Sequence, residues 1–70
     1  MNEIIFLIEN APEGGYNAKA LGHSIFTDAD DLDSLKANIR NAVLSHLDEG
    51  KHPKIVRMHF VHEETFGIAV

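Results

Sequence analysis

The chain of 70 residues contains no cysteine and no tryptophan. Without cysteine it has no disulfide bond, no cysteine nucleophile and no thiolate ligand for zinc. A domain of about 60 residues buries only about 60% of the surface that its unfolded chain exposes, so its stability is marginal without reinforcement. Oligomerisation is the ordinary reinforcement that remains, and we expect a homodimer or a higher homo-oligomer.

Basic residues are scarce as well. Six lysines and arginines stand against eleven aspartates and glutamates, which gives a formal net charge of −5. An acidic surface repels phosphate backbones, so we expect no direct nucleic-acid binding. A small acidic protein is better matched to a basic protein partner.

Long hydrophobic runs are also missing. The N-terminal sequence MNEIIFLIENAPEGG has an acidic residue at its third position and only a short apolar run. This pattern fits neither a signal peptide nor a membrane span. Together with the absence of cysteine, it predicts a cytoplasmic protein with no membrane partner.

The longest periodic segment, residues 31–50, predicts an amphipathic helix. Asp31 is expected to be its N-cap, Gly50 to take the left-handed conformation just past its end, and Pro53 to block continuation. Its apolar residues recur at steps of three and four, which gathers them on one stripe. The stripe consists of Leu32, Leu35, Ile39, Ala42, Val43 and Leu47. A single stripe predicts that the helix covers one face of a sheet.

Four short segments predict β-strands, at residues 3–9, 16–21, 24–27 and 54–62. The first segment, EIIFLIE, is apolar at both odd and even positions, so we expect a strand that is covered on both faces. Residues 65–70 are a candidate for a further edge strand.

The order of these elements, β-β-β-α-β, predicts an α+β fold in a single domain spanning residues 1–70. Three strands joined by short turns form an antiparallel meander, and a strand-helix-strand passage normally makes a right-handed crossover to a parallel strand. We therefore expect a mainly antiparallel four-stranded sheet of order 3-2-1-4, with the helix on one face and the first and fourth strands central and parallel.

Four aspartates lie around the expected start of the helix, and converging carboxylates suggest a site for a hard cation. The pattern of a calcium-binding loop is not met, because its fifth position would be Leu32 and its twelfth Ile39. Negative charge also suits a helix N-terminus without any metal. We interpret the run as a solvated, helix-capping turn made by Asp28, Asp30, Asp31 and Asp33.

The five histidines do not predict a metal site. His59 and His62 are three apart in a strand, so they point to opposite faces. His46 and His52 flank the expected helix end at a spacing that is not a zinc pattern. Beside Arg57, however, His59 makes a mildly basic, pH-sensitive strip on the sheet face away from the helix. We expect no metal and no cofactor.

Nothing in the sequence supports nucleophilic catalysis. The serines at positions 24, 34 and 45 lie in no nucleophile elbow, and no glycine-rich phosphate loop precedes the helix. The pair Gly14 and Gly15 precedes a strand, which makes it a turn. We expect no catalytic residue and no enzymatic activity.

The segment GGYNAKALGHSIFTDADDLDSLKANIRNAVLSHLDEG resembles the core of the HicB-like antitoxins. The family has a Gly-Tyr pair opening the second strand, a glycine before the third, an acidic turn, and an Asn-Ile-Arg/Lys-x-Ala segment in the helix. The resemblance covers residues 4–60. The matching positions are Gly15, Tyr16, Gly22, residues 28–32, Asn38, Ile39, Arg40 and Ala42.

The resemblance implies a fold like a partly degraded ribonuclease H domain, homodimerisation, and binding to a small basic ribonuclease toxin of the HicA-like kind. Full-length HicB antitoxins also carry a C-terminal DNA-binding segment. This chain ends at Val70, which leaves no room for one. We therefore expect a short member that neutralises a toxin without binding an operator.

The predicted function is thus an antitoxin-like protein-binding module that neutralises the toxin by occlusion. The alternative is a stand-alone domain that binds a small ligand or a metal. An exposed apolar patch usually marks association, and acidic groups steer a cationic partner. The predicted interface consists of Ile5, Leu7, Arg57, His59 and Val61. The predicted steering groups are Asp28, Asp30, Asp31, Asp48 and Glu49.

Overall fold

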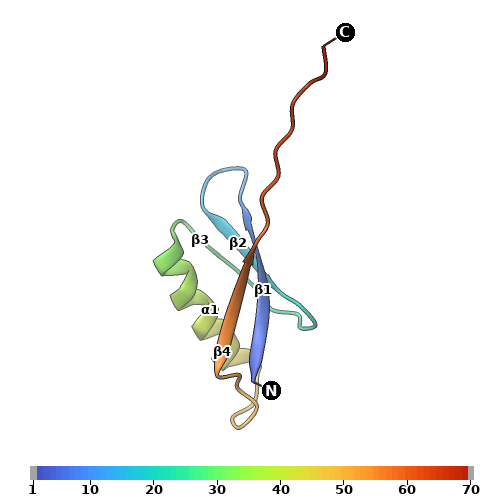
Figure 1. The fold of residues 1–70 in the computed structure, drawn as a ribbon. Helices are drawn as coiled ribbons and strands as arrows, with labels where there is room; N and C mark the ends of the chain where they lie inside the picture. The colour runs from blue at the N-terminus through green and yellow to red at the C-terminus, as the bar shows by residue number, and fades with distance from the viewer. Residues whose placement is uncertain (1, 70) are drawn as a thin grey trace.

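The computed structural model describes residues 2–69, which form one four-stranded sheet and one helix (Figure 1). The elements in chain order are β1 (Glu3–Asn10), β2 (Tyr16–Ala20), β3 (Phe26–Ala29), α1 (Leu32–His46) and β4 (Ile55–Phe60). The sheet order is β3-β2-β1-β4. The pairs β1–β2 and β2–β3 are antiparallel, and β1–β4 is parallel. The predicted α+β fold and strand order are confirmed.

One detail of the predicted topology is wrong: β4 is not a central strand. It pairs only with β1 and forms one edge of the sheet, while β1 and β2 are the inner strands. The order 3-2-1-4 requires this, because the crossover after α1 adds β4 outside β1. The outer edge of β4 therefore has no neighbouring strand within residues 2–69.

The third strand begins later than predicted, at Phe26 instead of Ser24. Ile25 is only 2% exposed and lies in the core just before the strand starts. Its carbonyl oxygen accepts a hydrogen bond of 3.0 Å from the backbone N–H of Ala20. Ile25 therefore anchors the turn before β3 and is not part of the strand.

The C-terminal segment is extended without being a strand. β4 covers Ile55–Phe60 instead of the predicted 54–62, although the N–H of Val61 still donates to the Ile8 carbonyl at 2.8 Å. Residues 61–69 run on beyond the end of the sheet (Figure 1). The candidate edge strand at 65–70 is therefore absent from 65–69, and Val70 lies outside the described residues.

The helix is shorter than predicted at its C-terminal end. Asp31 is the N-cap, as expected, but α1 ends at His46. Leu47 is the C-cap, and its N–H still donates to the Val43 carbonyl at 3.1 Å. Gly50 has a positive φ of 90° but lies in the next turn, closed by the N–H of Lys51 donating to Asp48. Among the described residues, no helix is long and apolar enough to cross a membrane.

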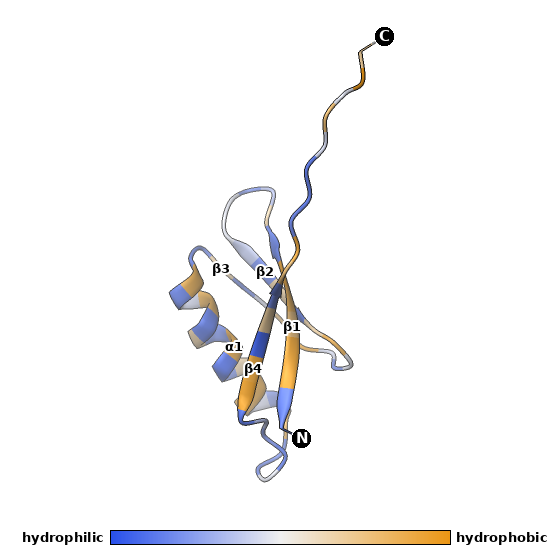
Figure 2. Ribbon diagram, in the orientation of Figure 1, coloured by the Kyte–Doolittle hydropathy of each residue, from blue (hydrophilic) through white to orange (hydrophobic). Residues whose placement is uncertain are grey.

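The core lies between α1 and one face of the sheet, where the apolar stripes of both meet (Figure 2). Its centre is Phe6, which is 0% exposed, against the helix residues Leu35 and Ile39. Leu32, expected on the helix stripe, is 36% exposed because it begins the helix. The buried residues are Ile4, Phe6, Ile8, Ala18, Ala20, Ile25, Leu35, Ile39 and Val43.

The turn before β2 depends on Gly15. Its φ is +82°, and an added Cβ would lie 2.6 Å from the carbonyl oxygen of Ala29. Gly14 also has a positive φ, +103°, but an added Cβ there would meet nothing within 4 Å. An alanine at either position would therefore have a strained backbone, but only an alanine at Gly15 would also clash with Ala29.

We expect Gly15→Ala to lower the free energy of unfolding by about 2–4 kcal/mol, because left-handed strain and overpacking add. The matched control Gly14→Ala has the strain alone, and we expect a loss of about 1–2 kcal/mol. Urea denaturation of both variants measures the difference. Equal losses would contradict the role assigned to the contact with Ala29.

Candidate functional site

The sheet face opposite α1, called the open face below, is covered by no other element within residues 2–69. Ile5 and Leu7 of β1 point to it, since Ile4, Phe6 and Ile8 point into the core. Both side chains are half-buried. The expectation that β1 is covered on both faces is therefore wrong for the described part of the chain.

The open face brings together the residues predicted as an interface. Ile5 lies beside Arg57 and Leu7 beside His59 in the parallel register of β1 and β4. Val61 follows the end of β4 and is 46% exposed. These five residues form one strip along β1 and the neighbouring edge strand.

Two apolar residues of the open face were missing from the predicted interface. Phe26 of β3 lies opposite Lys19 and is 66% exposed, and Ile55 of β4 lies beside Glu3 and is 56% exposed. Phe26 and Leu7 line a shallow hollow of about 500 Å³ on this face. Ile55 could have been found from the sequence, because it alternates with Arg57. Phe26 required the pairing of β3 with β2, which sets it opposite Lys19.

The charge on the open face differs from the prediction, because Arg57 is paired. Its Nη2 and Nε atoms donate to the Glu3 carboxylate at 3.0 and 3.2 Å. The pair is solvent-exposed, so it adds only about 0–1 kcal/mol of stability. It does balance the charge of the guanidinium, and the strip formed by Arg57 and His59 is less basic than expected.

The predicted steering groups do not form one cluster. Asp28 lies in β3, and Asp30 and Asp31 lie between β3 and the start of α1, whereas Asp48 and Glu49 follow the far end of α1. Any electrostatic steering would therefore come from both ends of the helix.

Asn38 connects the helix to the edge of the sheet. Its Nδ2 donates a hydrogen bond of 2.8 Å to the backbone carbonyl of Asp28. The partner carbonyl lies in β3, ten residues earlier in the chain. The amide therefore helps to hold α1 over β3.

The Asp31 carboxylate caps α1. Its Oδ1 accepts a 2.7 Å hydrogen bond from the backbone N–H of Ser34, and its Oδ2 accepts one of 3.2 Å from the Ser34 hydroxyl. These bonds stabilise the charged form, the backbone bond most, and lower the pKa of Asp31 from its ordinary value of 3.8. Asp31 therefore has a structural role in addition to its predicted role in steering.

The depressed pKa predicts an acid-sensitive helix start. Because the folded state holds Asp31 with a lower pKa than the unfolded chain, its contribution is present above pH 3.8 and is lost as pH falls through the folded pKa. We expect Asp31→Asn, which keeps the acceptor but cannot titrate, to flatten this part of the stability profile. Thermal unfolding between about pH 2 and 6 measures it. An Asp31→Asn profile with the same slope as that of the unmodified protein would contradict the assignment.

The histidines near the helix end bond to separate backbone carbonyls. His46 Nδ1 lies 2.9 Å from the Ala42 oxygen, and His52 Nε2 lies 2.8 Å from the Leu47 oxygen. Across residues 2–69, no three His, Cys, Asp or Glu side chains are grouped so that they could hold a metal ion.

Comparison with known proteins finds two close relatives. A protein of Archaeoglobus fulgidus, named UPF0150 protein, is 50% identical over 52 residues, which are 74% of this chain and 77% of the relative. A UPF0150 protein of Thermotoga maritima is 39% identical over 66 residues, 94% of this chain and 93% of the relative. The chain belongs to the UPF0150 family.

The names of these two UPF0150 relatives state no activity. No family model matches the chain, and no solved structure gives a significant match.

Proposed function

We propose that this UPF0150 protein is an antitoxin-like protein-binding module that neutralises a small basic ribonuclease of the HicA-like kind. The open face would lie over the active surface of the toxin and block access of RNA. The single observation that carries the proposal is a sheet face with no element over it within residues 2–69, on which large apolar side chains are exposed among polar ones. Its apolar side chains are Ile5, Leu7, Phe26, Ile55 and Val61.

The exposed apolar side chains of this face suit a protein partner. Stable protein interfaces bury about 800 Å² on each side, and a few large apolar or aromatic residues carry most of the binding energy. Phe26, at 66% exposed, is the largest candidate for such a residue. Leu7 lines the same hollow of the open face as Phe26.

Charge favours a basic partner. The net charge of −5 attracts a cationic protein and accelerates encounter, and salt screens this attraction. The acidic groups at both ends of α1 add to the field around the sheet. A small basic ribonuclease has the opposite charge.

The positions that resemble the HicB-like antitoxins include residues that hold the fold together. Gly15 allows the close approach of Ala29, and Asn38 holds α1 to β3. Both residues belong to the resembling positions, and both maintain the arrangement of helix and sheet. That arrangement leaves the open face available for a partner.

Co-expression tests the proposal. The probe is the product of the reading frame next to this gene, chosen if it is short and basic. We expect its induction alone to stop growth and to degrade cellular RNA, and co-expression of the present chain to restore both. An adjacent basic protein whose toxicity is unchanged by co-expression would overturn the proposal.

A further inference from the structure

A groove lies on the helix side of the sheet, between α1 and β4. It exists because α1 packs over β2 and β3 rather than over β4. The groove measures about 360 Å³. Its apolar lining consists of Ile39, Val43, Leu44, Pro53, Val56 and Met58.

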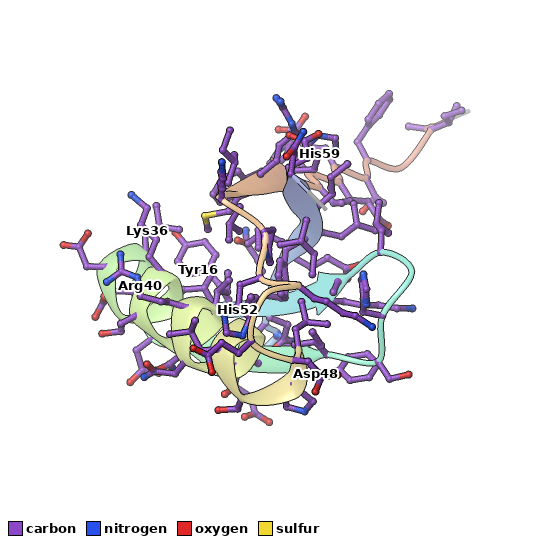
Figure 3. The ribbon with its side chains drawn as sticks, turned by 90° about the horizontal axis from the view of Figure 1, so that it is seen from below. Tyr16, Lys36, Arg40, Asp48, His52 and His59 are labelled. Carbon is purple, nitrogen blue, oxygen red and sulfur yellow. The ribbon has the colours of Figure 1, made fainter. Side chains whose placement is uncertain are left out.

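Positive charge gathers around this groove on an otherwise acidic protein. Lys36, Arg40 and Lys54 line it, which is half of the six lysines and arginines in the chain, and His52 lies beside them. None of the residues that line it is acidic. Figure 3 shows Lys36 and Arg40 together on α1, with His52 on the loop that leads to β4. The groove suits a segment that is both acidic and apolar.

The C-terminal segment of this chain has that composition. Glu63 and Glu64 precede Phe66 and Ile68, which are 88% and 84% exposed. The segment extends away from the sheet, and the molecule measures 58 × 21 × 17 Å (Figure 1). Its radius of gyration is 14.6 Å, whereas a compact domain of this length has about 11 Å. Two large apolar side chains thus lie uncovered on an extended arm.

The arm continues the direction and the alternation of β4. The side chains of His62 and Glu64, two residues apart, approach within 3.6 Å, as expected when alternate residues share one side of an extended chain. By the same alternation, Phe66 and Ile68 lie on that side too. Even-numbered residues of β4 face the helix side, since Val56 pairs with Ile4 and Met58 with Phe6.

We propose that the arm of one copy docks on β4 of a second copy and inserts Phe66 and Ile68 into its groove. The arm adds as an antiparallel strand to the free edge of β4, so that its backbone groups are paired. Phe66 then lies opposite Met58 of the second copy, and Ile68 opposite Val56. The two arms cross near residue 62, and a symmetric dimer results.

The sequence of the connecting residues favours a second copy over the same copy. To reach its own groove, the chain would have to reverse between β4 and Phe66. Residues 61–64, Val-His-Glu-Glu, contain no glycine, proline, asparagine or aspartate, which are the residues of tight turns. Glu64, which shares the helix side with Phe66 and Ile68, can instead approach Lys36 and Arg40 of the second copy.

Cross-linking tests the docking of the arm on a second copy directly, since the chain has no native cysteine. In the proposed register Thr65 lies opposite His59 of the second copy, while two copies of either residue lie about 20 Å apart along the strands. We expect a short bismaleimide to join Thr65→Cys to His59→Cys when the two variants are mixed, and neither variant to itself. No cross-link in the mixture would overturn the proposal, as would a cross-link within one chain carrying both cysteines.

Sedimentation equilibrium gives an independent test. We expect the unmodified chain to be a dimer at about 100 µM, and Phe66→Ser/Ile68→Ser to dimerise at least about 100-fold more weakly. The control Phe26→Ser lies on the open face and should leave the dimer intact. A monomeric unmodified chain, or a dimer lost only in Phe26→Ser, would overturn the proposal. Because the groove and the open face lie on opposite sides of the sheet, this test is independent of the proposed toxin.

Discussion

Phe6→Ala is expected to leave the protein largely unfolded at 25 °C. Phe6 is 0% exposed and lies at the centre of the core, so the truncation removes a full aromatic side chain from between sheet and helix. Such changes cost about 3–5 kcal/mol. A domain this small has a total stability of about 5 kcal/mol or less, so most of the folding free energy is lost. Circular dichroism and urea denaturation measure the effect.

The matched control is the same substitution at Phe26. This side chain is 66% exposed on the open face and contributes little to the core. We expect Phe26→Ala to change the free energy of unfolding by about 0.5 kcal/mol or less. If both variants were equally destabilised, the core would not lie only between α1 and the sheet.

Truncating the open face is expected to abolish partner binding while leaving the fold intact. The double variant Leu7→Ala/Phe26→Ala removes both apolar side chains beside the hollow of this face. Interface residues of this kind contribute about 1–3 kcal/mol each, so we expect affinity for the neighbouring basic protein to fall at least about 30-fold. Isothermal titration calorimetry measures this.

The control for this prediction is Leu32→Ala, a leucine truncation at the start of α1, away from the open face. We expect its affinity to equal that of the unmodified chain, and circular dichroism to show that all variants are folded. Unchanged binding by the double variant would show that the partner uses another surface.

The sequence was sufficient for the core and the strand order. The alternation in β1 and the three- and four-residue spacing in α1 identify residues that are buried, such as Phe6, Leu35 and Ile39. The crossover rule then places β4 beside β1. Element ends were harder. Gly50 predicts a later helix end, but the backbone is already extended at Leu47, the C-cap, so α1 ends before Gly50.

The candidate site was only partly predictable, because it depends on contacts between distant segments. Ile5, Leu7, Arg57, His59 and Val61 could be assigned to one face by counting alternate residues. The pairing of Arg57 with Glu3 could not, since it joins residues 54 positions apart through the register of two strands. The place of Phe26 on this face depends on the register of β3 against β2, which sets it opposite Lys19.

The central claim is that the open face binds a small basic protein. Methyl NMR of the chain labelled at isoleucine and leucine, titrated with the purified neighbouring basic protein, tests it most directly. The account predicts that the methyl signals of Ile5, Leu7 and Ile55 shift with saturation, while those of Leu32 and Leu44 on α1 stay in place. Saturable shifts confined to α1, or no shifts with a protein whose toxicity this chain suppresses, would contradict it.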